Sequence, residues 1–295
     1  MLVLIILLAI SGTSHYGLLD SYSTQYAKIN DINVSNLRVY GSIAYVIGLI
    51  TSGYVINLFG YGVSFIICSV LFTLTSIMYL IIKPIFDEIK NHEEKRNYKE
   101  VFSNKGYLLF LIYYVFMFGI QKASNNYYGL LLESKGISSS GYGYVYAMGV
   151  VMEVITLILF NKLNKKLNFK ILLLIAIASI AIQNMINGSN LSVYVIISSY
   201  ILRGIAYGIL LHVNYKILVN LVGVKNSTIV ILLEELGINI LVIIANAIGG
   251  NIIENISYNA YYLILGSMAF LDLIYYLIFV QKYVIKNDKI EVVNV

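Results

Sequence analysis

Residues 228–252 read TIVILLEELGINILVIIANAIGGNI. An α-helix rises about 1.5 Å per residue, so a mainly apolar stretch of this length can cross the roughly 30 Å hydrocarbon core of a bilayer. Two adjacent acids, Glu234 and Glu235, interrupt the run. An ionisable side chain at this depth costs about 2.5 to 3.5 kcal/mol, so it normally faces a bundle interior and finds a partner there. The stretch therefore predicts a transmembrane helix with at least one functional acid.

Further stretches of similar length and composition occur along the chain. They cover residues 1–22, 38–58, 62–82, 107–131, 141–161, 169–188, 192–215 and 258–281. Only 12% of the residues are charged and the mean hydropathy is +0.80, whereas soluble domains carry roughly 25% charged residues. The first stretch lacks the basic start of a signal peptide, so we retain it as a helix. The sequence predicts an all-α, polytopic membrane protein with about nine transmembrane helices.

Lysine and arginine gather in alternate loops, which fixes the expected orientation because these residues remain on the cytoplasmic side. The cations concerned are Lys28, Lys83, Lys90, Lys95, Arg96, Lys99, Lys105, Lys162, Lys165, Lys166, Lys170, Lys216, Lys225, Lys282, Lys286 and Lys289. The opposite loops carry only Lys135. We expect a multi-pass protein of the cell membrane with a cytoplasmic C-terminus. The cytoplasmic loops account for the net charge of +5, so no nucleic-acid partner is expected.

The longest hydrophilic interval, residues 84–106, begins with the only proline, Pro84, and predicts a cytoplasmic linker. It separates a partial N-terminal bundle of three helices, residues 1–83, from a six-helix bundle, residues 107–284. A cytoplasmic tail, residues 285–295, follows. The odd helix count with an external start leads us to expect that three helices are missing upstream from a transporter of two six-helix halves.

Several short motifs carry a family resemblance over nearly the whole chain. They are NLRVYGSIAY at 36–45, YVYAMG at 144–149, GGNIIE at 249–254 and YLILG at 262–266. The sequence resembles lactose permease and its relatives, the oligosaccharide and proton symporters of the major facilitator superfamily. The resemblance implies a helical bundle of that type, with the helices here equivalent to helices four to twelve. It also implies a secondary transporter that takes up a small polar solute, such as a sugar, together with protons.

The resemblance implies particular substrate contacts. Asp20 precedes Arg38 by 18 residues, the spacing of the acid and arginine that bind sugar in that family, and Tyr45 falls where those permeases carry a tryptophan that stacks on the sugar. A salt bridge that closes the cytoplasmic gate is the alternative for Asp20 and Arg38. His15 is either a further substrate contact or a histidine that is simply hydrogen-bonded near a helix end.

Other positions depart from the family pattern. The sugar-binding glutamate of helix eight falls at Val150, and Glu153 stands about one turn later. The histidine and the proton-carrying glutamate of helix ten fall near Arg203 and Ala206, and the lysine of helix eleven falls at Ile238. Galactoside specificity and the family's own coupling mechanism are therefore not carried over.

Polar residues follow helical spacing on the helices that bear the buried charges. The stripes are Tyr142, Tyr146, Gly149, Glu153 and Thr156; Tyr200, Arg203, Tyr207 and Asn214; and Lys122 with Asn125, Asn126 and Gly129. They could line a wet cavity, with Lys122 and Asn126 as substrate contacts. Alternatively, they join helices through hydrogen bonds and close glycine packing.

Two charge pairs are expected. Lactose permease pairs acids in its seventh helix with a lysine in its eleventh, and the resemblance places Lys122 and Glu235 on these helices with the signs reversed, so it implies that they pair; backbone carbonyls or other neighbours are the alternative. Glu153 is the expected proton carrier, because a carboxylate in a desolvated site can bind a proton that a nearby Arg203 displaces. The alternative is a permanent ion pair between Glu153 and Arg203. Asp272 has no partner that the sequence identifies.

Other functional classes find little support in the sequence. There is no HExxH or GxSxG motif and Cys68 has no cysteine partner, so neither an enzyme, a metal site nor a cofactor is expected. No repeated filter indicates a channel. We expect a monomer that binds a small polar solute and protons within the lipid bilayer. The alternatives are a permease for nucleosides or other small solutes, and a truncated remnant that no longer transports.

Overall fold

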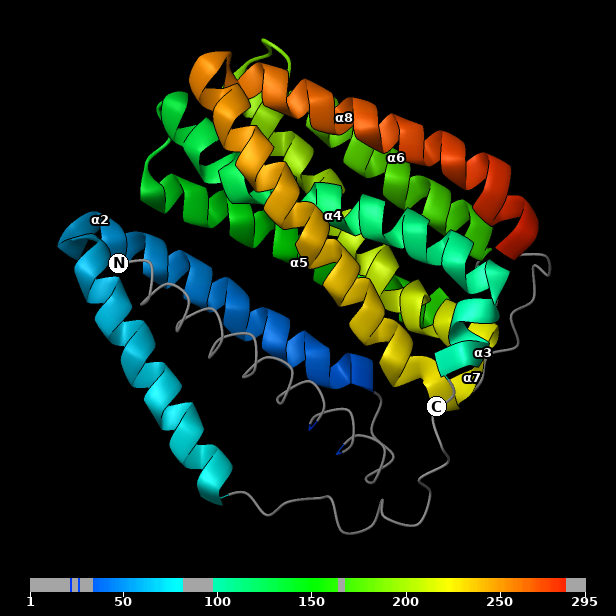
Figure 1. Ribbon diagram of the computed structural model, residues 1–295. Helices are drawn as coiled ribbons and strands as arrows, with labels where there is room; N and C mark the ends of the chain where they lie inside the picture. Colours follow the sequence, from blue (N-terminus) through cyan, green and yellow to red (C-terminus); the bar gives the residue numbers. More distant parts are fainter. Residues whose placement is uncertain (1–21, 23–25, 27–33, 82–97, 164–167, 285–295) are drawn as a thin grey trace.

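All described elements are helices in this computed structural model, which describes Tyr22, Tyr26 and residues 34–81, 98–163 and 168–284 (Figure 1). They are α2 (Val34–Ile81), α3 (Tyr98–Ser103), α4 (Lys105–Ser134), α5 (Ser139–Leu163), α6 (Phe169–Asn187), α7 (Val193–Asn255), α8 (Tyr258–Tyr275) and the π-helix η3 (Tyr276–Val284). Within the described residues, seven helical spans are long and apolar enough to cross a membrane. The predicted all-α, polytopic architecture is confirmed.

Two glycines divide the longest helices into arms. Gly60 in α2 has φ 79° and ψ 175°, and Gly223 in α7 has φ 76° and ψ 163°. This region of backbone space is essentially restricted to glycine, so each residue makes a sharp turn that side-chain-bearing residues would oppose. The arms correspond to the predicted pairs of helices at 38–58 and 62–82 and at 192–215 and 228–252. The predicted helix at 1–22 lies outside the described residues, except for its last residue.

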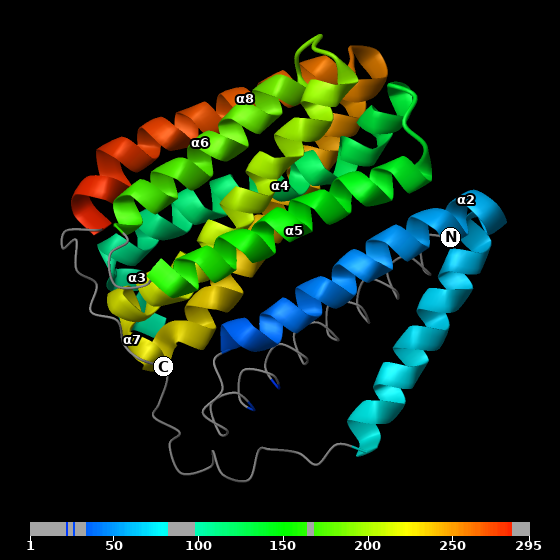
Figure 2. The ribbon, with the colours of Figure 1, turned by 180° about the vertical axis from the view of Figure 1, so that it is seen from behind.

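The helices from α4 onward form one bundle, and the first arm of α2 packs along its side (Figures 1 and 2). Helix α5 lies between α7 and this arm, whereas α6 packs against α7 and α8. The second arm, residues 61–81, diverges from the bundle in both views, and its apolar side chains are exposed. The polar stripes of α5 and α7 are therefore brought to the contact between these two helices.

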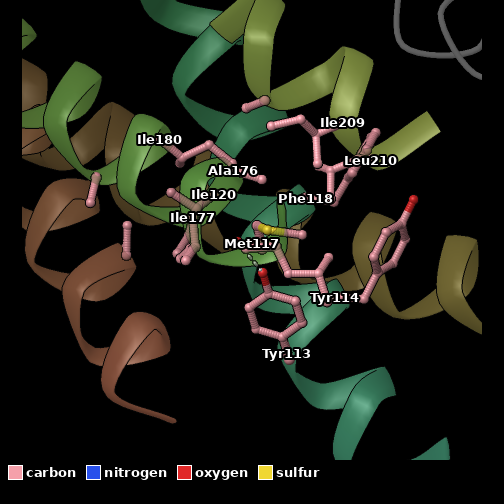
Figure 3. Packing of buried hydrophobic residues seen from close by; sticks show 14 of the residues in the cluster. Tyr113, Tyr114, Met117, Phe118, Ile120, Ala176, Ile177, Ile180, Ile209 and Leu210 are labelled. Atoms are coloured by element: carbon pink, nitrogen blue, oxygen red, sulfur yellow. Dashed lines mark hydrogen bonds between the residues drawn. The ribbon is translucent and has the colours of Figure 1, made fainter. Parts of the chain in front are cut away.

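Part of the core lies where α4, α6 and α7 meet, and Figure 3 shows apolar side chains from all three helices packed there. Its fully buried members include Met117 and Ile120 from α4, Ile177 from α6, and Ile209 from α7. Lipid tails are as apolar as these side chains, so close packing rather than exclusion of water stabilises the contact.

Tyrosine hydroxyl groups connect neighbouring helices across the bundle. They donate hydrogen bonds to backbone carbonyl oxygens: Tyr113 to Leu173 (3.1 Å), Tyr128 to Ile196 (3.1 Å), Tyr261 to Ala123 (3.1 Å), Tyr262 to Ser124 (2.8 Å) and Tyr276 to Lys170 (2.6 Å). Each bond satisfies a hydroxyl that would otherwise be unpaired in an apolar interior. Bonds of this kind contribute about 0.6 to 2 kcal/mol between membrane helices.

The predicted linker at 84–106 ends in ordered structure. Helix α3 lies in it, and Asn104 then caps α4 by accepting a hydrogen bond from the backbone nitrogen of Tyr107. The same Asn104 side chain donates to the carbonyl oxygen of Leu221 at 2.6 Å. The start of α4 is thereby attached to α7 just before the turn at Gly223.

Replacement of Gly223 tests the turn between the two arms of α7. Gly223→Ala places a Cβ on a backbone conformation that only glycine adopts readily, at a cost of about 1 to 3 kcal/mol. We expect the thermal unfolding midpoint in detergent to fall by a few degrees. Gly48→Ala is the matched control, because Gly48 is helical and no atom of the described residues lies within 4 Å of the added Cβ. Equal midpoints for the two variants would contradict the turn.

Candidate functional site

Helices α5 and α7 approach each other through glycines in both polar stripes. A Cβ added at Gly204 would lie 2.2 Å from the carbonyl oxygen of Gly149, and one added at Gly208 would lie 2.7 Å from the Cβ of Thr156. The two predicted stripes therefore face each other directly. Along this contact, the small residues of the two stripes pack the helices together, as the alternative to a wet cavity predicts. The charged side chains lie beside the contact.

Arg203 lies in a cage of three tyrosine rings. Its Cζ atom is 4.7 Å from the ring centroid of Tyr207, 5.0 Å from that of Tyr200 and 5.5 Å from that of Tyr146. Arg203 is only 6% exposed, and its Nε and Nη1 atoms donate to no acceptor among the described residues. Cation–π contacts compensate part of the cost of burying the charge. We call these four residues the Arg203 cage.

Helix α4 fixes the position of two cage rings. The hydroxyl of Tyr200 donates to Oδ1 of Asn125 at 2.7 Å, and that of Tyr146 donates to the backbone oxygen of Asn125 at 2.9 Å. The ring of Tyr128 also stacks on Tyr200, with centroids 4.7 Å apart. The cage is therefore anchored on three membrane segments, α4, α5 and the first arm of α7.

Glu153 lies next to the cage. It is partly buried on α5 and within electrostatic range of both Arg203 and Tyr207. The structure thus brings together the acid and the base that the sequence placed in a coupling pair.

Lys122 and Glu235 form the predicted ion pair, with Nζ 3.0 Å from Oε2. Their side chains are 31% and 52% exposed, so the pair lies at the margin of the bundle. The Lys122 Nζ is also 5.7 Å from the ring centroid of Phe118, and that ring is 4.9 Å from the ring of Tyr207. A continuous series of contacts therefore joins the exposed pair to the Arg203 cage. We call Lys122, Glu235, Glu153 and Arg203 the charge network.

Two further acids are buried away from these contacts. Glu234 is 2% exposed and accepts a hydrogen bond from Nδ2 of Asn214 at 2.9 Å. Asp272 is 5% exposed, close enough to Tyr113 to affect it electrostatically. The sequence analysis expected Glu235 to pair with Lys122, and the structure shows this pair while Glu234 contacts Asn214 instead.

The remaining predicted contacts are mostly not described. Asp20 and His15 lie outside the described residues, as does the side chain of Arg38 near the start of α2. Asn126 is exposed. Tyr45 is 52% exposed on the first arm of α2 and lies near Tyr142 of α5. Tyr45 alone among the three proposed sugar contacts can therefore be placed beside the bundle.

The sequence missed the cage as a unit. It placed Tyr146, Tyr200 and Tyr207 in polar stripes, but it gave no sign that their rings surround one guanidinium. The spacing of Arg203 and Tyr207 on one helix face was the available signal. Within the described ranges, no group of three or more His, Cys, Asp or Glu side chains could bind a metal ion.

Comparison with known proteins gives three matches. A family model described as the MFS_1 like family matches residues 1–264. The "Uncharacterized transporter YwbF" of Bacillus subtilis (strain 168) is 27% identical over 136 residues, 46% of this chain and 34% of the relative. The "Probable 3-phenylpropionic acid transporter" of Escherichia coli (strain K12) is 26% identical over 168 residues, 54% of this chain and 42% of the relative. Each match covers less than half of the relative's length.

A charge exchange tests the ion pair at the margin of the bundle. Lys122→Glu and Glu235→Lys each place two like charges side by side, so we expect less folded protein and a lower melting temperature in detergent. The double exchange restores opposite charges and should recover most of the loss. Lys135→Glu, in the loop after α4, is the control and should behave like the unaltered protein. A double variant no better than the worse single variant would argue against the pair.

Proposed function

Because the chain belongs to the MFS_1 like family, a family of membrane transporters, we propose that it takes up a small polar solute together with protons. The observation that carries this proposal is the charge network in the bundle. Both relatives are also named as transporters, which supports transport rather than catalysis. The matches cover only part of those relatives, so the activity of the whole protein is itself part of the proposal.

The charge network supports transport because its cost exceeds what helix packing requires. Glycine contacts and tyrosine hydrogen bonds already join these helices. Ionisable groups at membrane depth add a penalty, and they commonly mark pathways of substrates, ions or protons. The exposed ion pair at one end of the network and the buried arginine at the other fit such a pathway.

Proton coupling is proposed for Glu153, assisted by Arg203 and Glu235. A carboxylate beside a guanidinium remains charged while the two are in contact, and it can bind a proton once the guanidinium turns to another partner. Exchange of partners between two conformations would thus move a proton across the membrane. A permanent Glu153 and Arg203 ion pair is the competing account, and it predicts no proton movement.

We propose a chemical class for the solute and not a single compound. The resemblance to lactose permease implies a sugar or oligosaccharide, bound by Asp20, Arg38 and Tyr45, with nucleosides as the alternative. One relative is named for a carboxylic acid, so small organic anions are also candidate solutes. We further propose a monomer in the cell membrane with a cytoplasmic C-terminus, divided at residues 84–106 as the sequence predicts.

Uptake by proteoliposomes tests the proposal. Vesicles containing the full chain are given an inward proton gradient and a panel of labelled sugars, nucleosides and small carboxylates. We expect gradient-driven accumulation of at least one class, and a loss of more than about tenfold in Glu153→Gln, which cannot exchange a proton. Asp272→Asn is the matched control, because it removes a buried acid outside the network, and it should retain uptake. No accumulation above empty vesicles for any class would favour the non-transporting remnant.

A further inference from the structure

The guanidinium of Arg203 is buried with hydrogen-bonding capacity to spare. The Arg203 side chain is only 6% exposed, and its Nε and Nη1 atoms have no acceptor among the described residues. The tyrosine rings offer their faces to the positive charge, but ring faces do not replace strong acceptors. Buried donors of this kind are rare, and each calls for a partner that the protein alone does not supply.

A carboxylate is the ligand group that best matches these donors. The guanidinium is planar and presents its N–H groups as a fork, which fits the two oxygen atoms of a carboxylate. A neutral hydroxyl would satisfy one donor and leave the charge of Arg203 without a new counter-charge. The geometry therefore favours an anion over a sugar at this position.

The surroundings of the cage indicate an aromatic body for that ligand. The ring of Phe118 lies 4.9 Å from that of Tyr207, and Tyr114 stacks on Phe118 with centroids 5.4 Å apart. Tyr114 and Phe118 are each only 7% exposed, so a flat ligand ring would extend a buried aromatic series at the separations that aromatic pairs prefer. Glu153 is only partly buried, so the side of the cage next to Glu153 is the less enclosed one.

Charge balance adds a proton to the binding event. The charge network contains two cations, Lys122 and Arg203, and two acids, Glu235 and Glu153. Lys122 is already paired with Glu235. A ligand carboxylate at Arg203 adds one negative charge beside Glu153, which is costly in a site shielded from water. One proton on Glu153 removes that excess and leaves the total charge of the site unchanged.

Two titratable side chains face Glu153 from α7, namely Arg203 and Tyr207. From the first arm of α2, Tyr45 approaches the same helix at Tyr142. The tyrosines remain neutral at ordinary pH, so Arg203 is the charged group whose change of partner affects Glu153 most.

We propose that the Arg203 cage binds the carboxylate of a small aromatic acid, and that Glu153 takes up one proton from water as the anion binds. Glu153 becomes a neutral carboxylic acid and the ligand carboxylate takes its place beside Arg203. This inference rests on the proposed transport function and names its substrate class. The transported unit is then an anion plus a proton, which carries no net charge, whereas a sugar plus a proton carries one positive charge.

Calorimetry on the purified full chain in detergent tests the site. The probes are phenylacetate and phenylacetamide, which share a ring and differ in charge. We expect phenylacetate to bind more than about tenfold more tightly than the amide, because a charge-assisted hydrogen bond is lost with the amide. A single proton should be taken up per phenylacetate, measured from the dependence of the binding heat on the buffer. Equal affinity for acid and amide, or no binding of either, would overturn the proposal.

Variants separate the roles of the two residues. Arg203→Gln should lose the preference for the acid, because it removes the positive charge, whereas Arg203→Lys keeps the charge without the guanidinium fork and should retain only part of the preference. Glu153→Gln resembles the protonated state and should bind phenylacetate at least as tightly, with no proton uptake. This variant keeps the proposal testable if the Arg203 variants do not fold. Asp272→Asn is the control and should match the unaltered chain. Proton uptake that persists in Glu153→Gln would refute the assigned role of Glu153.

The outcome can be separated from that of the transport proposal. Proton-driven uptake of a neutral sugar without any binding of phenylacetate would refute the carboxylate site and retain the transporter. Binding of phenylacetate with proton uptake, but without gradient-driven transport into vesicles, would retain the site and count against the transporter.

Discussion

The cost of burying a guanidinium inside a membrane bundle must be compensated, and this constraint organises the helices around Arg203. Arg203 is 6% exposed, and the faces of three tyrosine rings and a nearby acid compensate part of the cost of burying its charge. Glycines at 149 and 204 let α5 and α7 approach closely enough for Tyr146 and Tyr200 to reach it. A bulkier residue at either glycine would separate the helices and open the cage.

Tyrosine supplies most of the specific contacts between helices. The chain contains 27 tyrosines and no tryptophan, and many of the tyrosines are buried in the bundle with their hydroxyls on backbone carbonyls of a neighbouring helix. These hydrogen bonds hold neighbouring helices of the bundle together. The second arm of α2 has the least packing among the described helices, and its apolar side chains are exposed.

The sequence predicted the helices because hydropathy is a local property, and the resemblance to lactose permease predicted the ion pair between Lys122 and Glu235. Hydropathy over about 20 residues decides whether a segment spans a membrane, and opposite charges on two embedded helices tend to meet. The sharp turns at Gly60 and Gly223 were predicted only as gaps between apolar runs. The cage around Arg203 and the burial of Glu234 were not predicted, since they depend on the rotation of α5 and α7 about their axes. That rotation is set by glycine contacts along the whole interface.

The most direct test of the account is a double-mutant cycle between Arg203 and Glu153. Melting temperatures in detergent are compared for Arg203→Gln, Glu153→Gln and the double variant. If the two groups compensate each other inside the bundle, the double variant loses clearly less stability than the sum of the single losses. Strictly additive losses would show that the two charges do not interact, and the coupled network would then have no physical basis.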